Sequence, residues 1–169
     1  DTCDARASWG DREKKLQILK DTHAGAFAVT GGGLYLLLYC GGCSELPVRG
    51  AAAVSVGFVL SRALSGLAAA VFPGAREHGM LADFMKDSRR RLVAASMVFY
   101  MAVSAGAMIL LGGLCGAAAA LGAVLAFLYY RRMVFREFGG VTGDLAGYFL
   151  QLCELFMVLA AAVCHLAIS

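Results

Sequence analysis

Carboxylate side chains near the start of the chain have the spacing of a metal site. Asp1 and Asp4 are three residues apart, so on a helix they would share one face. Asp21 follows a basic segment and precedes the first apolar run. Hard divalent cations bind few protein carboxylates and leave positions open for substrate phosphates. A cluster of Asp1, Asp4 and Asp21 would fit a divalent metal ion used in phosphoryl or nucleotidyl transfer, whereas acidic pairs on cytosolic surfaces are usually only solvated.

A second set of candidate residues lies at 139–154, which reads GGVTGDLAGYFLQLCE. The glycines let the backbone turn tightly, and Thr142 is suited to cap the helix that follows. We expect Asp144 to point toward the metal or the substrate. Glu154 lies deeper in the same apolar run, where a charged side chain needs a partner.

The elements that carry these residues are predicted to be membrane helices. Hydrophobic residues make up 60% of the chain and charged residues 16%, and the mean hydropathy is +0.71, outside the usual balance of soluble domains. A helix needs about 20 apolar residues to cross a bilayer. Four runs reach that length: 24–43, 50–72, 92–130 and 145–168. The third is nearly twice as long as one crossing requires, so we expect a turn at GGLCG, residues 112–116.

The sequence thus predicts an all-α fold, a polytopic integral membrane helix bundle of about five transmembrane helices in one domain over 1–169. Alternate connecting segments hold every Lys and Arg except Arg49 and Arg62, and every Asp and Glu except Glu45 and Glu154. Because basic segments are retained in the cytoplasm, we expect the N-terminus to be cytoplasmic and the C-terminus outside.

Two cytoplasmic segments have the pattern of amphipathic helices. In 11–21, Leu16 and Leu19 share a face surrounded by charges. In 79–91, the apolar residues Met80, Leu81, Phe84 and Met85 form a stripe. We expect both segments to be interfacial helices that lie along the lipid headgroups.

Arg62 and Glu154 are predicted to form an ion pair inside the membrane. Each lies ten residues from the cytoplasmic end of its span, counted from Phe72 and Asp144, which corresponds to a depth of about 15 Å. A lone charge at that depth is costly, and pairing is the usual remedy. We expect a direct contact, or one bridged by Gln151, at the floor of a substrate cavity.

Taken in order, these motifs resemble the adenosylcobinamide-GDP ribazoletransferase (cobalamin 5′-phosphate synthase) family over nearly the whole chain. GGVTGD is the most specific motif. Ala5 stands where the family usually has Gly, and the family's Asp-Gly before Asp1 is not in this sequence. We therefore expect the chain to be an inactive fragment that lacks an N-terminal span or spans and the first part of the aspartate motif. The matching segments are DTCDA (1–5), KDTHAGAF (20–27), Ser61 with Arg62, PGAREHG (73–79), and GGVTGD with Glu154.

The resemblance implies a transferase of the cell inner membrane that joins adenosylcobinamide-GDP to α-ribazole or its 5′-phosphate and releases GMP, in the last steps of cobalamin biosynthesis. It implies Mg²⁺ as the cofactor, bound by Asp1, Asp4 and Asp21, with Asp21 also the candidate base. The expected partners are these substrates and membrane lipid, with no nucleic acid, and a homo-oligomer is left open. The residues expected to bind substrate are Lys20, Arg62, Arg76, Thr142, Asp144 and Glu154.

Two alternatives stay open. CDP-alcohol phosphotransferases use a similar aspartate cluster, but their signature closes with GxxxD and another Asp three residues later, which this segment lacks. A small multipass transporter would use Arg62, Gln151 and Glu154 as a polar path. Transporters tend to place carboxylates at the bilayer midplane, whereas here most belong to one face, which favours the enzyme.

Overall fold

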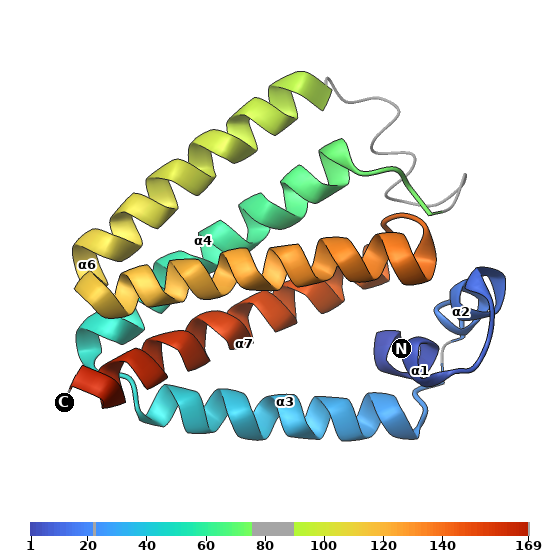
Figure 1. Cartoon of the computed structure of the whole chain (residues 1–169), viewed down its shortest axis with the longest axis horizontal. Coiled ribbons are helices and arrows are strands. Elements are labelled where there is room, and N and C mark those ends of the chain that lie inside the picture. The colour runs from blue at the N-terminus through green and yellow to red at the C-terminus, as the bar shows by residue number, and fades with distance from the viewer. Residues whose placement is uncertain (22, 76–89, 169) are drawn as a thin grey trace.

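The computed structural model describes residues 1–21, 23–75 and 90–168, which fold into a helical bundle (Figure 1). These residues form helices and no β-strand, so the all-α prediction is confirmed for the described chain. The elements are α1 (Thr2–Ala7), α2 (Arg12–Ile18), α3 (Ala26–Ser44), α4 (Val48–Val71), α6 (Arg90–Met133), the π-helical segment η1 (Val134–Phe138) and α7 (Gly143–Ile168).

Among the described residues, four helices are long and apolar enough to cross a membrane: α3, α4, α6 and α7. The 44-residue helix α6 is interrupted at Gly113, where φ is 56° and ψ is −128°. Only glycine adopts such a conformation without strain. Figure 1 shows α6 doubling back at this bend, so its two arms form a hairpin. The predicted turn within 112–116 is confirmed, so among the described residues α3, α4, the two arms of α6 and α7 make up five segments.

Small residues let the helices of the bundle approach closely. The second arm of α6 buries Ala119, Ala123 and Ala126 completely. A Cβ atom added to Gly122 would lie 2.7 Å from the carbonyl oxygen of Phe156 in α7, so a larger residue does not fit there. Such close backbone packing is the usual way in which membrane helices associate. Helices α4, α6 and α7 therefore form the core, whereas α3 lies at its edge and buries only Gly42.

The charged segments of the protein meet at one end of the bundle. Figure 1 shows α1, α2, the end of α4, both ends of α6 and the start of α7 at this charged end. The Gly113 bend, the α3–α4 connection and the C-terminus lie at the opposite end. Every described Lys and Arg except Arg49 and Arg62 belongs to a segment at the charged end, as the alternation of basic segments predicts.

The predicted helix at 11–21 is confirmed as α2, but its apolar side faces the protein. Leu19 is only 5% exposed and belongs to the core, and Leu16 packs against that core. This helix therefore docks on the end of the bundle through the side that was expected to face lipid headgroups. Residues 79–89 of the predicted helix at 79–91 lie outside the described residues. Residues 90 and 91 belong to the start of α6.

Candidate functional site

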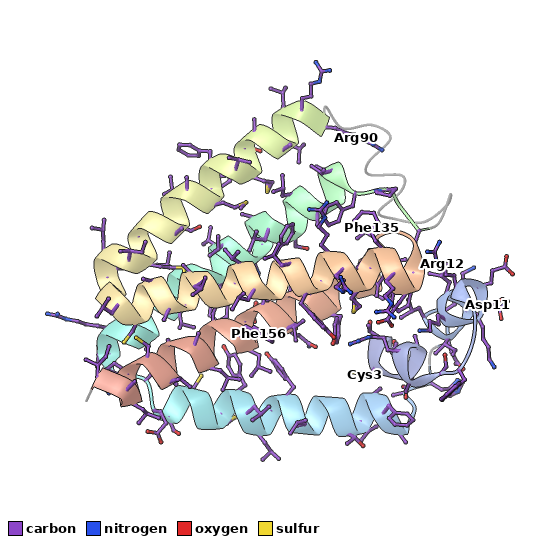
Figure 2. All side chains as sticks on the ribbon, viewed as in Figure 1. Cys3, Asp11, Arg12, Arg90, Phe135 and Phe156 are labelled. Atoms are coloured by element: carbon purple, nitrogen blue, oxygen red, sulfur yellow. The ribbon has the colours of Figure 1, made fainter. Side chains whose placement is uncertain are left out.

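A cavity of about 500 Å³ lies between α1, α3 and α7. Two carboxylates line it, Asp1 at the start of α1 and Asp144 in the first turn of α7. Cys3, labelled in Figure 2, also belongs to its wall. The cavity begins at the charged end and extends along the facing sides of α3 and α7. Its other lining residues are Thr2, Ala28, Gly31, Gly32, Leu34, Tyr35, Leu38, Gly147, Tyr148, Gln151, Leu152 and Leu155.

Two glycines shape the turn that leads to Asp144. Gly139 has a φ of 77°, in the left-handed region, and ends η1. A Cβ atom on Gly140 would lie 2.6 Å from both the nitrogen of Ala75 and the carbonyl oxygen of Pro73. The segment that follows α4 therefore passes directly against the GGVTGD turn, and only glycine permits that approach.

Backbone hydrogen bonds join these two segments. The Ala75 N–H donates to the Val141 carbonyl oxygen at 3.0 Å, and the Val141 N–H donates to the Pro73 carbonyl oxygen at 2.9 Å. The Leu145 N–H then donates to the Thr142 hydroxyl oxygen at 3.3 Å, so the predicted cap of the last helix is confirmed. These hydrogen bonds hold the turn from both sides. They therefore fix the backbone position of Asp144 at the start of α7.

Asp4 does not point into the cavity. One of its carboxylate oxygens accepts the Gly25 N–H at 2.8 Å, and the other accepts the N–H groups of Phe27 and Ala28 at 3.0 and 3.2 Å. These are unpaired amides of the first turn of α3, where a negative charge is also favoured by the helix dipole. Asp4 therefore caps α3 and fastens α1 to it.

Asp21 and Lys20 lie in the exposed connection between α2 and α3. One oxygen of Asp21 contacts His23 twice, at 3.0 Å from its backbone N–H and 2.8 Å from its Nδ1 atom. Neither Asp21 nor Lys20 lines the cavity. Within the described parts of the chain, no group of three or more His, Cys, Asp or Glu side chains is placed to hold a metal ion. Asp1, Asp4 and Asp21 therefore do not form one such group, because Asp4 is bound to the amides of α3 and Asp21 lies in a loop outside the cavity.

The predicted pair of Arg62 and Glu154 is confirmed. The Arg62 Nη1 atom donates to the Glu154 Oε1 atom directly, with no need of Gln151, and also to the Ser61 hydroxyl at 2.9 Å. The Glu154 side chain is 12% exposed, whereas the Arg62 side chain is 56% exposed and lies over the ring of Phe58. The pair does not itself line the cavity, although its α7 neighbours Gln151 and Leu155 do.

Sequence reasoning missed the tyrosines of the cavity, and it considered Gln151 only as a bridge between Arg62 and Glu154 or as part of a transport path. Tyr148 and Gln151 follow Asp144 by four and seven positions, which places all three on one face of α7. That spacing could have identified both residues. Tyr35 of α3 carried no such signal, because its neighbours on α3 are apolar or glycine. Arg76, which was expected to bind substrate, lies outside the described residues.

The fold and the cavity define the class of protein: a polytopic membrane protein with a carboxylate-lined site at its charged end. The family model described as cobalamin-5-phosphate synthase matches residues 1–162. The chain therefore belongs to the cobalamin-5-phosphate synthase family.

Curated relatives agree with this assignment. An adenosylcobinamide-GDP ribazoletransferase of Lachnoclostridium phytofermentans is 42% identical over 163 residues, which cover 96% of this chain and 62% of that protein. The enzyme of the same name from Pseudomonas fluorescens strain SBW25 is 33% identical, with 96% of this chain and 66% of the relative covered. That of Chlorobium phaeovibrioides is 32% identical, with 99% and 68% covered. The chain thus spans about two thirds of the length of these relatives. No solved structure matches it.

Proposed function

We propose that the protein acts as an adenosylcobinamide-GDP ribazoletransferase, which joins adenosylcobinamide-GDP to α-ribazole or α-ribazole 5′-phosphate and releases GMP. The observation that carries this proposal is the family match over residues 1–162, together with relatives named for this activity. The cavity supports it as well, because its two carboxylates can hold a divalent ion that binds the phosphates of the substrate. Membership of this family favours ribazole transfer over CDP-alcohol chemistry or transport.

The reaction is a displacement at phosphorus. A hydroxyl oxygen of the ribazole attacks the phosphorus linked to cobinamide, and the new oxygen–phosphorus bond replaces the bond to GMP. The hydroxyl proton passes to a carboxylate. The predicted base is Asp21, and Asp1 and Asp144 are further candidates because they line the cavity. Asn variants of the three aspartates would distinguish them.

The donor set of the cavity fits a bound Mg²⁺. This ion usually takes one or two protein carboxylates and leaves its other positions to water and substrate phosphate. Asp1 and Asp144 offer two exposed carboxylates in one cavity. When bound, Mg²⁺ would neutralise the charge that develops on the departing GMP. Asp4 and Asp21 are weaker candidates for this role, because their oxygens accept backbone hydrogen bonds.

The cavity also offers neutral groups that can bind a substrate. Tyr35, Tyr148 and Gln151 line it with hydroxyl and amide groups that donate and accept hydrogen bonds. Thr142 is 5% exposed and its hydroxyl caps α7, so it would act on the substrate through the position of Asp144. Arg62 and Glu154 would stabilise the packing of α4 against α7. Lys20 and Arg76 would contribute positive charge that attracts the substrate phosphates.

The proposed location is the cell inner membrane, with the charged end in the cytoplasm and the C-terminus outside. The concentration of basic residues at the charged end supports this orientation. Lipid would cover the apolar residues of α3, of which Leu37 is 74% exposed. The same face would pack against a second copy in a homo-oligomer, and the molar mass of the protein in detergent would decide between lipid and a second copy.

The activity can be tested with the protein expressed at full length in a membrane and purified in detergent. Adenosylcobinamide-GDP and α-ribazole are supplied with Mg²⁺, and GMP and the cobalamin product are measured by chromatography. The proposal predicts equal amounts of both products, formed only when both substrates are present. Release of GMP without the cobalamin product would indicate hydrolysis and would contradict the proposed function.

A further inference from the structure

Helix α1 is a short element that is fastened to the bundle on two sides. Asp4 binds the first turn of α3, as described above, on one side. On the other side Arg6 reaches η1 and α7. Asp1 lies at the start of the same six-residue helix, so these attachments set where its carboxylate lies in the cavity.

Arg6 contacts three other elements at once. Its Nε atom donates to the Oε2 atom of Glu137 at 3.3 Å, and its Nη2 atom to the Oε1 atom at 3.4 Å, so the guanidinium grips both oxygens of one carboxylate. Its Nη1 atom donates to the Tyr148 hydroxyl at 3.3 Å. The guanidinium also lies 5.6 Å from the centre of the Tyr129 ring. Lys15 of α2 adds a second cation, 3.4 Å from Glu137.

The contact between Arg6 and Glu137 joins α1 to the segment that carries Asp144. Glu137 belongs to η1, immediately before the GGVTGD turn, and Tyr148 lies one helical turn beyond Asp144. Arg6 therefore ties α1 to both sides of the segment that carries Asp144. Tyr148 itself lines the cavity. The contact thus connects the two carboxylates of the cavity through Arg6 and Glu137, which do not line the cavity themselves.

We propose that Arg6 and Glu137 are positioning residues, whose ion pair holds α1 so that Asp1 and Asp144 face the same cavity. Exposed ion pairs contribute little to stability, but this one is largely covered, with side-chain exposures of 30% and 22%. Its bidentate geometry fixes direction as well as distance. The inference rests on the proposed function for its effect on the reaction, but not for its effect on α1.

The attachment of α1 can be measured without any substrate. Cys3 lies on α1, and its sulfur packs against Gly31 of α3, where an added Cβ atom would come within 2.9 Å. Because Cys3 is half-buried and lines the cavity, it has a basal alkylation rate while α1 is docked. An increase above that rate, measured with N-ethylmaleimide and peptide mass spectrometry on the purified protein, reports that α1 detaches from α3 more often. Cys153 is completely buried in α7 and serves as an internal control against general unfolding.

Arg6→Gln and Glu137→Gln are each expected to raise the alkylation rate of Cys3 by about fivefold or more, with the Cys153 rate unchanged. The double variant is expected to show less than the combined effect of the single variants, because both substitutions remove the Arg6–Glu137 contact. Each also removes one contact of its own, that of Arg6 with Tyr148 or that of Glu137 with Lys15. Lys14→Gln is the matched control on α2, since the Lys14 side chain is exposed and its Nζ atom donates to the Trp9 carbonyl oxygen rather than to Glu137. Unchanged Cys3 rates in both single variants, or effects that add, would overturn the inference.

A second measurement separates this inference from the proposed function. In a protein that releases GMP, Arg6→Gln and Glu137→Gln are expected to lower kcat about tenfold or more, with little change in KM, and Arg6→Lys is expected to recover only part of the loss. Faster Cys3 alkylation with an unchanged kcat would show that the pair does not position the reacting groups. If the unmodified protein releases no GMP, the proposed function fails, and the Cys3 rates still decide whether the pair holds α1.

Discussion

The guanidinium of Arg62 in α4 donates to the carboxylate of Glu154 in α7, within the apolar part of the bundle. Glu154 is 9% exposed, so removal of its partner leaves a charge that is largely hidden from water. Arg62→Gln is expected to lower the free energy of unfolding by about 2 kcal/mol, measured by denaturation in mixed micelles. In the Arg62→Gln, Glu154→Gln double variant the loss should be smaller than the sum of the single losses. If the losses of the two single variants simply add in the double variant, the contact contributes nothing to the free energy of unfolding.

Two glycines of one motif should respond in opposite ways to alanine. Gly140→Ala places a Cβ atom 2.6 Å from backbone atoms of Pro73 and Ala75, so the turn has to move. The expected loss is about 2 kcal/mol or more of unfolding free energy. Gly143→Ala meets nothing within 4 Å at the start of α7 and should be neutral or slightly stabilising. Equal melting temperatures for the two variants would contradict the close approach at Gly140.

The carboxylates of the cavity should be needed for the reaction. Asp1→Asn and Asp144→Asn are each expected to lower the rate of GMP release at least about a hundredfold, because both would bind the metal or accept the proton. Removal of divalent ions by EDTA should stop the reaction, and added Mg²⁺ should restore it. Asp11→Asn is the control, since Asp11 is exposed and only caps α2. Full activity after complete chelation would rule out the metal site.

The orientation in the membrane can be tested by labelling. Glu45 lies beyond the end of α3, at the end of the bundle opposite α2, whereas Lys14 belongs to α2. In intact cells a membrane-impermeant maleimide should label the Glu45→Cys variant and leave the Lys14→Cys variant unlabelled until the cells are permeabilised. Peptide mass spectrometry distinguishes these sites from the native cysteines. The reverse pattern would place the charged end outside.

Much of the fold was predictable, because the length of an apolar run is itself a structural constraint in a membrane. The run at 92–130 was too long for one crossing, and its turn lies at Gly113, inside the predicted GGLCG. The pairing of Arg62 with Glu154 followed from their equal depths in two spans. The cap by Thr142 followed from the local chemistry of a helix start. Each of these predictions required only the positions of residues along one segment, or the depths of two residues in the membrane.

Contacts between distant segments were not predictable in this way. The spacing of Asp1 and Asp4 suggested a shared metal ion. No feature of the local sequence indicates that the amides of α3 lie beside α1 and donate hydrogen bonds to the Asp4 carboxylate. The bond between Arg6 and Glu137 joins residues 131 positions apart. The glycine at 140 was expected to permit a turn, whereas it also admits the backbone that follows α4. Such contacts depend on how helices pack, which a sequence pattern does not specify.

The central claim is that the cavity between α1, α3 and α7 is where ribazole transfer takes place, and filling the cavity tests it most directly. Gly147 lines the cavity, and an added Cβ atom there meets nothing within 4 Å, so Gly147→Leu projects into open space. Gly106 of α6 is equally open but does not line the cavity, which makes Gly106→Leu the matched control. Measured as kcat/KM for GMP release, Gly147→Leu should lose about tenfold or more, equivalent to about 1.4 kcal/mol, while Gly106→Leu keeps the unmodified value. Full activity in a folded Gly147→Leu variant would contradict the claim.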